Sequence, residues 1–313
     1  MGLHAYHSPE MDALVEKTMR EIGDAIEALN IPKLGGVVLG GGYARGEGGV
    51  FETGPGAPRL SNDLDFYVVT EPGAGEADIA RIGEMLRPLS ARWTQKLGVD
   101  VDFCTAKTPW RLKHDEERLM IQELVHGYFD VAGRKGEELF AHVERRAPSR
   151  LPWLEAIRLL VNRGAGLLFA QEPGRDRAFV VRNINKAILG AGDARLIARG
   201  AYQWSAEARA AQLGDPLYMR ALDWKFRPAE TAVCPWEDAR QVWLAAADAI
   251  LALGRPRRTL RHALRWLVRR RSLGNPLTFG LPPEVRLLRN MRRVLKRRGA
   301  FTPALKRDWE IFN

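Results

Sequence analysis

A glycine-rich turn followed by an acidic strand is the feature that most constrains how this chain can fold. Residues 40–46 read Gly-Gly-Gly-Tyr-Ala-Arg-Gly directly after a short apolar stretch, and residues 63–70 begin with alternating acidic and apolar side chains. Successive strand residues point to opposite faces, so Asp63 and Asp65 share one face and their apolar neighbours share the other. Two adjacent carboxylates repel unless a cation lies between them, and their oxygens suit Mg²⁺. The pattern predicts a divalent-cation site beside a turn whose backbone amides can bind phosphate.

A second acidic strand follows at residues 98–104, which read Gly-Val-Asp-Val-Asp-Phe-Cys. Asp100 and Asp102 would share a face of that strand, and periodicity alone does not choose between them. One of them, placed beside Asp65 by a neighbouring strand, would complete a site for two metal ions about 3.5–4 Å apart. The alternative interpretation of the strand that carries Asp63 and Asp65 is an edge strand with one solvated face, which is common in antiparallel sheets. Asp100 lies nearer the start of its strand and is expected to be solvated.

Two better-known phosphate-binding motifs are excluded by the residues around the turn. Gly41 and Gly46 have the spacing of a P-loop, but Glu47 stands where that motif requires lysine. A Rossmann fingerprint is also excluded, because Gly40 and Gly42 are not followed by a third glycine three residues later. On its own, the turn would indicate a tight strand-to-helix connection and nothing more.

The turn, the Asp-x-Asp strand and the later aspartate, in this order, resemble the DNA polymerase β-type nucleotidyltransferase superfamily. The resemblance covers residues 35–105, and Ala-Arg-Gly after the turn is typical of the smaller bacterial members, which include antibiotic nucleotidyltransferases. The family pattern favours Asp102 over Asp100 as the third carboxylate. The chain departs from the pattern at Asn62, where serine is commoner, and in the long Gly/Pro-rich loop that precedes it.

The resemblance implies a Mg²⁺-dependent enzyme that transfers a nucleoside monophosphate, expected to be AMP from ATP, to a hydroxyl acceptor and releases pyrophosphate. Asp63 and Asp65 would hold two Mg²⁺ ions, and Asp102 would complete the ion near the acceptor oxygen. Gly41 and Gly42 would contact the triphosphate through their backbone. Phosphoryl transfer depends on positioning and charge neutralisation, which is why so few residues can define such a site.

Two basic residues are candidates for nucleotide binding. Arg45 has a planar fork suited to phosphate, but it could equally pair with Glu47. Lys186 lies in a segment, residues 185–202, that is similar to the helical domain of these enzymes, and the resemblance implies a contact with the triphosphate. The alternative for Lys186 is an ordinary solvated lysine on a helix.

Apolar periodicity and turn residues predict an α+β fold in two parts. Residues 1–148 are expected to form a small α+β domain, and residues 149–313 an all-helical domain. The resemblance implies that the first is a mixed-sheet, palm-like nucleotidyltransferase domain and that the second binds the substrate. In the first part the sequence predicts helices over 9–29, 75–97 and 113–126, a short helix near 44–48, and strands at 35–39, 63–70, 99–105 and 128–132. In the second part it predicts helices over 153–171, 178–200, 203–213, 217–227, 236–253, 258–271 and 282–298.

The composition of the chain indicates its cellular compartment and argues against a membrane partner. The chain of 313 residues has two cysteines, Cys104 and Cys234, which lack metal-ligand spacing, so a reduced cytoplasmic protein is expected. It has no apolar run of about 18 residues, and no membrane partner is expected.

The net charge of +10 is concentrated near the C-terminus, because residues 255–298 contain fifteen Lys or Arg and one acid, Glu284. This block can bind nucleic acid or another anionic partner, or it can be two amphipathic helices with solvated arginines. A small-molecule hydroxyl acceptor is the expected substrate, and an RNA acceptor that uses the basic block is the alternative. A third hypothesis is a non-catalytic nucleotide- or RNA-binding protein, against which the presence of all three carboxylates argues.

Overall fold

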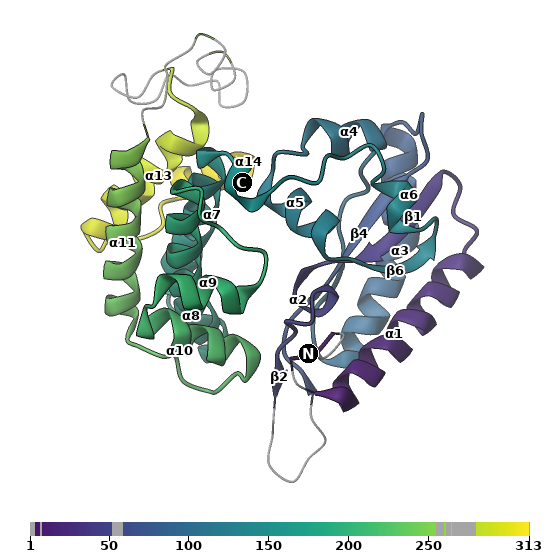
Figure 1. Cartoon of the computed structure of the whole chain (residues 1–313), viewed down its shortest axis with the longest axis horizontal. Coiled ribbons are helices and arrows are strands. Elements are labelled where there is room, and N and C mark those ends of the chain that lie inside the picture. The colour runs from purple at the N-terminus through teal and green to yellow at the C-terminus, as the bar shows by residue number, and fades with distance from the viewer. Residues whose placement is uncertain are drawn as a thin grey trace. The chain divides into compact units, whose positions relative to one another are not determined.

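The computed structural model describes residues 4–6, 8–51, 59–254, 260, 264 and 280–312. The chain forms two compact units (Figure 1). The first comprises Met1–Arg146 together with the short segment Lys225–Pro228, and the second comprises Ala147–Trp224 and Ala229–Asn313. The division after Arg146 lies close to the expected boundary at 148, whereas the sequence pattern does not predict that Lys225–Pro228 joins the first unit.

The first unit is a mixed α+β fold with a small sheet, and this part of the predicted fold class is confirmed. Its helices are α1 (Pro9–Ala28), α2 (Gly41–Ala44), α3 (Glu76–Leu97), α4 (Pro109–His114), α5 (Leu119–His126) and α6 (Gly136–Leu139). Its strands are β1 (Leu34–Leu39), β2 (Val50–Phe51), β3 (Arg59–Leu60), β4 (Leu64–Thr70), β5 (Val101–Phe103) and β6 (Phe129–Gly133).

Four strands form the central sheet in the order β5–β4–β1–β6. Strand β1 is antiparallel to both β4 and β6, whereas β4 and β5 run parallel. A parallel pair needs a crossover connection, which α3 supplies between β4 and β5. Strands β2 and β3 form a separate two-stranded ribbon that the sequence does not predict.

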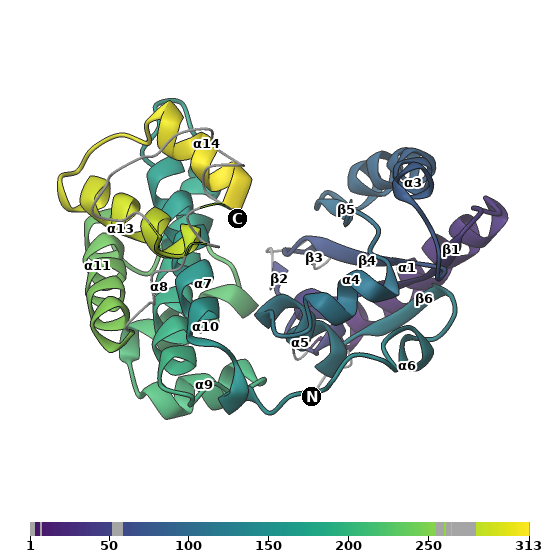
Figure 2. The same cartoon turned by 90° about the horizontal axis from the view of Figure 1, so that it is seen from above.

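Helices pack on both faces of this sheet. Leu64, Phe66 and Val101 belong to the core shared with α1 and α3, while Val38 and Val69 belong to the core shared with α4, α5 and α6 (Figure 1). Figure 2 shows the same layers from above, with α3 on one side of β4 and with α4 and α5 on the other. Because side chains alternate along a strand, the acidic positions of β4 and β5 lie on the side opposite α1 and α3.

A segment that the sequence predicts as one helix forms two shorter helices. The sequence predicts a helix over 113–126, but the chain forms α4 and α5 with a turn between them. Asp115 lies in this turn, is buried, and forms ion pairs with Arg111 at 2.8 Å and Arg118 at 3.7 Å. A buried carboxylate is costly unless it is paired, and these two arginines, one in α4 and one directly before α5, provide the partners.

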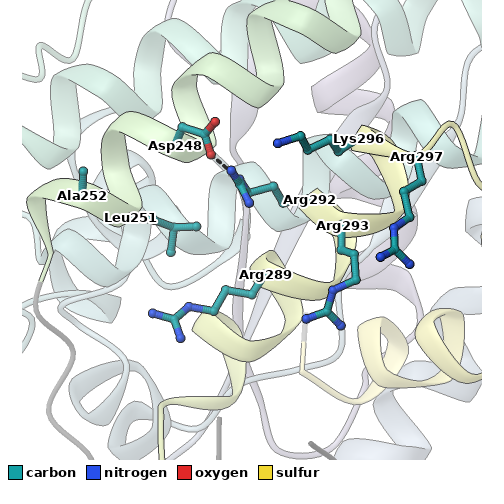
Figure 3. Close-up of a pocket in the computed structure, with 8 residues that line it drawn as sticks. All are labelled: Asp248, Leu251, Ala252, Arg289, Arg292, Arg293, Lys296 and Arg297. Carbon is teal, nitrogen blue, oxygen red and sulfur yellow. Dashed lines mark hydrogen bonds and ion pairs between the residues drawn. The ribbon is translucent and has the colours of Figure 1, made fainter. Parts of the chain in front are cut away.

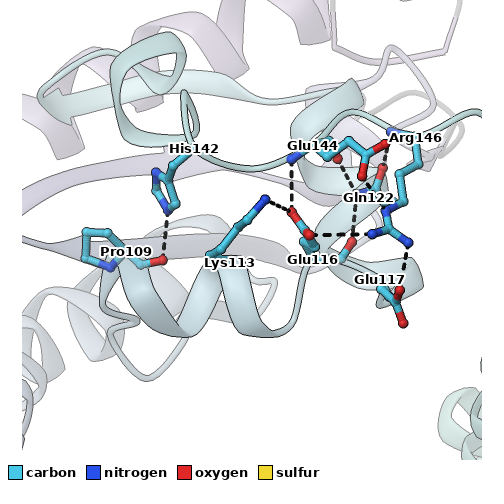
Figure 4. Close-up of polar contacts among 8 residues, drawn as sticks. All are labelled: Pro109, Lys113, Glu116, Glu117, Gln122, His142, Glu144 and Arg146. Atoms are coloured by element: carbon cyan, nitrogen blue, oxygen red, sulfur yellow. Dashed lines mark hydrogen bonds and ion pairs between the residues drawn. The ribbon is translucent and has the colours of Figure 1, made fainter.

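A polar network joins α5 to the last residues of the first unit (Figure 4). The side-chain amide of Gln122, which is fully buried, donates to the carbonyls of Glu116 and Glu144 at 2.6 and 2.8 Å. Its side-chain oxygen accepts from the Arg146 amide at 2.8 Å, and the Arg146 guanidinium pairs with Glu117 at 2.9 Å. The network satisfies buried polar groups where the unit ends.

The second unit is helical in the part that the structure describes. Trp243 of α11 is buried, and its indole N–H donates to the carbonyl of Leu160 in α7 at 2.9 Å. Helix α14 is not predicted by the sequence, and the predicted helix over 258–271 lies outside the described residues apart from Leu260 and Leu264. The helices are α7 (Trp153–Phe169), α8 (Arg177–Ala198), α9 (Ala206–Leu213), α10 (Pro216–Phe226), α11 (Trp236–Leu253), α13 (Pro283–Lys296) and α14 (Pro303–Phe312).

Candidate functional site

The parallel pairing of β4 and β5 brings Asp65 and Asp102 together. Their Cα atoms are register partners, and the register pairs on either side of them are apolar and pack in the core beneath α1 and α3. Register partners on neighbouring strands point to the same face, so both carboxylates project from the opposite side of the sheet. Asp65 is half-buried and Asp102 is exposed. The structure thus contains the alternation that the sequence predicts in both strands.

The other two acids of the pattern lie at the starts of these strands. Asp100 precedes β5 and is exposed, and its carbonyl accepts from the Leu64 amide at 2.8 Å. Asp63 is half-buried just before β4. In the described part of the chain, no three His, Cys, Asp or Glu side chains are gathered closely enough to hold a metal ion. The convergence of Asp63, Asp65 and Asp102 on Mg²⁺ therefore stays a prediction.

The chemistry of the neighbouring pair nevertheless suits magnesium. Mg²⁺ is commonly bound by one or two carboxylates together with waters and substrate phosphates. Asp65 and Asp102 supply that number from adjacent strands. A third carboxylate at close range would repel the other two without a cation, so Asp63 has no electrostatic reason to join them in the metal-free chain.

The glycine turn runs directly against Asp65. Gly41 has a φ of +72°, which residues with a side chain rarely adopt, and a Cβ there would lie 3.2 Å from Oδ2 of Asp65. The Gly40 amide donates to the Asp65 carbonyl at 2.9 Å, and a Cβ on Gly40 would meet the Tyr67 ring at 2.5 Å. Gly41 and Gly42 begin α2, and the first amides of a helix have no acceptor within it. Backbone donors and a carboxylate are therefore neighbours here.

Tyr43 fixes the segment before Asp63 to the segment after the turn. Its buried hydroxyl donates to the Gly49 carbonyl at 2.7 Å and accepts from the amides of Ser61 and Asn62 at 3.0 and 3.3 Å. The Asn62 side chain adds a further bond, because its oxygen accepts from the Gly49 amide at 2.6 Å. The sequence reasoning missed both residues. For Tyr43, the one available signal in the sequence was a large side chain among several glycines, which indicates a structural role for that side chain.

Arg45 takes the second of its two predicted roles. Its guanidinium lies 3.8 Å from Oε2 of Glu47 and 3.9 Å from Oε2 of Glu123 on α5. Glu47 is buried, and Lys225 also pairs with it at 3.0 Å. The absence of a side chain at Gly127 makes room, since a Cβ there would lie 2.3 Å from Cγ of Arg45. A phosphate contact by Arg45 would require it to exchange these carboxylates for phosphate oxygens.

The acids impose a negative field on two neighbouring groups. Burial raises the pKa of the Cys104 thiol to about 11, and the charges of Asp102 and Asp65 add to the rise. Burial also raises the pKa of Tyr67, and the charges of Asp65 and Glu123, together with the Cys104 thiolate that forms only at high pH, act in the same direction. Both groups are protonated at neutral pH, so the negative charge near the turn comes from the carboxylates.

Lys186 belongs to the second unit. It is half-buried on α8, directly after the fully buried Asn185. The Asn185 side chain donates to the Val181 carbonyl at 3.1 Å and accepts from the Val233 amide at 3.2 Å. Tyr202, at the end of the segment that resembles the helical domain of nucleotidyltransferases, is buried. The predicted contact between Lys186 and a triphosphate stays a prediction.

Comparison with protein-family models, with curated proteins and with solved structures gives no match to this chain. No helix in the described ranges combines the length and the apolar character that crossing a bilayer requires. The functional interpretation therefore depends on the residues of the glycine turn, the acidic strands and their contacts.

Proposed function

We propose that the chain is a Mg²⁺-dependent nucleotidyltransferase whose catalytic domain is the first unit. The observation that carries the proposal is the register pairing of Asp65 with Asp102, with the Gly41 backbone against the Asp65 carboxylate. The reaction would move a nucleoside monophosphate, AMP from ATP, onto a hydroxyl group. A bond forms between the acceptor oxygen and the α-phosphorus, the bond from that phosphorus to the bridging oxygen breaks, and pyrophosphate leaves.

The three carboxylates have distinct proposed roles. Asp63 and Asp65 would hold both ions, and Asp102 would complete the coordination of the ion nearest the acceptor oxygen. When bound, Mg²⁺ supplies neutralisation of the phosphate charge and orientation of the phosphate oxygens. The proton of the acceptor hydroxyl would pass to Asp102 or to a base in the second unit. Asp102 is exposed and so is accessible to an acceptor.

The turn would contribute through its backbone. Gly41 and Gly42 would donate their amides to the triphosphate, and the close approach of Gly41 to Asp65 leaves no room for a side chain between phosphate and metal ligand. Tyr43 would hold this geometry, because its hydroxyl binds both the chain after the turn and the chain before Asp63. Preorganised donors of this kind need no rearrangement during the reaction.

The proposed acceptor is a small molecule with a hydroxyl group, and RNA is the alternative. Lys186 is proposed to contact the triphosphate, and Arg45 to contact it after releasing Glu47 or Glu123. With Cys104 and Cys234 both free thiols, a reducing cytoplasmic setting is proposed.

The experiment that tests the proposal is transfer of label from nucleotides. The purified protein would be incubated with each of the four ribonucleoside triphosphates labelled at the α-phosphate, together with Mg²⁺ and a cell extract. We expect label from ATP in a small-molecule fraction and an equal release of pyrophosphate. Label in RNA would support transfer but correct the acceptor. No label in any fraction with any of the four nucleotides would contradict the proposed function.

A further inference from the structure

A basic groove lies between α11 and α13 in the second unit (Figure 3). It is an open hollow with a volume of about 800 Å³. Helix α11 contributes one acid and two small or aliphatic residues to its lining, α13 contributes four cations, and the residue that caps its C-terminus contributes a fifth. The lining residues are Asp248, Leu251, Ala252, Arg289, Arg292, Arg293, Lys296 and Arg297.

The helical repeat of α13 concentrates these cations on one face. Arg289, Arg292, Arg293, Lys296 and Arg297 follow one another at spacings of three, one, three and one, which keeps them within a single arc of the helix. The opposite face is apolar and buried, and it carries Leu288, Met291 and Leu295. The groove face is thus the solvent-facing half of an amphipathic helix, but it opens into a hollow instead of onto a flat surface.

The charges of the groove are not balanced within the described chain. Asp248 is the one acid in the lining, and it forms an ion pair with Arg292 (Figure 3). Among the described residues, Arg289, Arg293, Lys296 and Arg297 have no carboxylate partner. Several unpaired cations around one hollow repel one another, and an anion would relieve this repulsion.

Other arginines of the same unit show what a structural role requires. Arg240 of α11 is buried and donates to the Leu295 carbonyl at 2.8 Å. Arg298 lies just beyond the groove residues and pairs with Glu237 at 3.1 Å. Arg158 pairs with the buried Glu284 at 3.0 Å. These three arginines have partners that hold the unit together, whereas four of the five cations in the groove have no carboxylate partner in the described ranges.

We propose that this groove binds the phosphate backbone of a nucleic-acid strand. Arginine forks match phosphate oxygens, and four of the five cations are arginines. The cations run from Arg289 to Arg297, which is about 12 Å along a helix axis at 1.5 Å per residue. That length spans several phosphates, since each strand of a duplex carries one phosphate per roughly 3.4 Å of helix axis. A bilayer surface is flat and cannot enter a hollow, so the concave shape favours a strand over a membrane.

The binding proposal does not depend on the proposed reaction, since the groove lies within the second unit and contains none of the three carboxylates. Binding would be independent of base sequence, because the described lining residues offer cations, one acid and aliphatic groups but no aromatic surface for base stacking. If nucleotidyl transfer also holds, such binding would favour RNA as the acceptor.

The test is a salt titration of binding to a labelled single strand of about twelve nucleotides, as RNA and as DNA, followed by fluorescence anisotropy. Counterion release gives a slope of about −0.7 per phosphate contact on single strands, so four unpaired cations predict a slope of about −2.8. Affinity of the native chain should therefore fall about 50-fold between roughly 50 and 200 mM salt.

A pair of matched triple variants separates the groove from net charge. The first variant replaces Arg293, Lys296 and Arg297 by Gln. Its affinity should fall only about threefold between roughly 50 and 200 mM salt, because one unpaired cation remains in the groove. All three side chains are exposed, so the fold should tolerate the change. The control variant replaces three other exposed arginines of the second unit by Gln, and so it removes the same amount of charge. These are Arg177, Arg199 and Arg220. The salt dependence of the control variant should match that of the native chain.

A single substitution should act in the opposite direction. Asp248→Asn removes the acid of the lining and releases Arg292, which adds a fifth cation for phosphate. Affinity should then rise, and the loss between about 50 and 200 mM salt should increase to about 100-fold.

Two outcomes would overturn the proposal. One is equal weakening by the groove and control variants, which would mean that net charge alone attracts the strand. The other is binding to vesicles of phosphatidylserine and phosphatidylcholine without binding to either strand, which would assign the groove to a membrane surface.

Discussion

Asp65 and Asp102 are register partners on the parallel strands β4 and β5, and this pairing holds their carboxylates on the same side of the sheet. The apolar register pairs beside them are part of the core under α1 and α3. Neither aspartate can therefore turn to the other face without burying its charge in place of an apolar side chain. The core of the first unit thus determines where its candidate metal ligands lie.

Asp65→Ala should abolish transfer while the metal-free fold holds or gains stability. Removing one of two neighbouring carboxylates relieves repulsion, so the melting temperature in EDTA should stay level or rise. Transfer should fall by at least about 100-fold, as it does when one preorganised electrostatic group is lost. Differential scanning fluorimetry with and without Mn²⁺ should show stabilisation of the native protein by metal but none of the variant. A variant that unfolds, yet stays active in its folded fraction, would assign Asp65 a structural role.

Gly41→Ala should damage the site more than the fold. The φ of +72° makes alanine unfavourable by about 1–2 kcal/mol, and its Cβ would press on Oδ2 of Asp65. Gly73→Ala is the matched control, because Gly73 has a φ of +81° and nothing within 4 Å of the added Cβ. Urea unfolding should show similar losses of stability for both variants, with transfer lost in Gly41→Ala alone. Equal transfer activity of the two variants would show that the conformation of the glycine turn is not required for the reaction.

Tyr43→Phe should destabilise the first unit by about 1–3 kcal/mol, because the Gly49 carbonyl and the amides of Ser61 and Asn62 lose their hydrogen bonds to the hydroxyl. The Ser61 amide and the Gly49 carbonyl would keep only the bond between them, at 3.2 Å. Transfer should fall as well, since the segment before Asp63 loses its attachment to the turn. Tyr128→Phe removes the hydroxyl of a half-buried tyrosine in the same unit and should leave both properties close to native. Chemical denaturation with a parallel transfer assay checks the pair, and a native-like Tyr43→Phe would show that the tether is dispensable.

The same tyrosine predicts a pH dependence of stability. Burial raises the pKa of Tyr43 to about 12 in the folded chain, above its ordinary value of 10.0. The folded state therefore favours the neutral phenol, and the resulting stability is complete below pH 10 and is lost as the pH rises toward about 12. The two-unit rise corresponds to at most about 3 kcal/mol. Unfolding free energies between pH 9 and 12 should fall less steeply for Tyr43→Phe than for the native chain, and identical profiles would refute this origin.

The sequence predicts local alternation and the order of the elements well, because these depend on near neighbours in the chain. The acid-apolar alternation around Asp65 and Asp102 requires only the two-residue period of a strand. The two aspartates are close together because β4 and β5 are adjacent and parallel. The sequence suggests this pairing only through its resemblance to nucleotidyltransferases. The register of β4 against β5 makes Asp102, and not Asp100, the partner of Asp65. The periodicity of a single strand cannot predict its register with a neighbouring strand.

Other features depend on contacts between distant residues and so have no local signal. Lys225 pairs with Glu47 although 178 positions separate them. Tyr43 and Asn62 act through hydrogen bonds to backbone groups, which carry no side-chain pattern. The break between α4 and α5 at Asp115 lies in the middle of a segment with helical periodicity, and that periodicity carries no signal for it.

Transfer activity of Asp102→Asn compared with Asp100→Asn tests the central claim most directly. Both substitutions remove one exposed carboxylate, in β5 or directly before it, and change shape little, but only Asp102 is the register partner of Asp65. With labelled ATP, Mg²⁺ and the acceptor fraction, Asp102→Asn should lose at least about 100-fold of the transfer rate, and Asp100→Asn should remain within a few-fold of native. Native-level transfer by Asp102→Asn, or loss in Asp100→Asn instead, would contradict the assignment of the site.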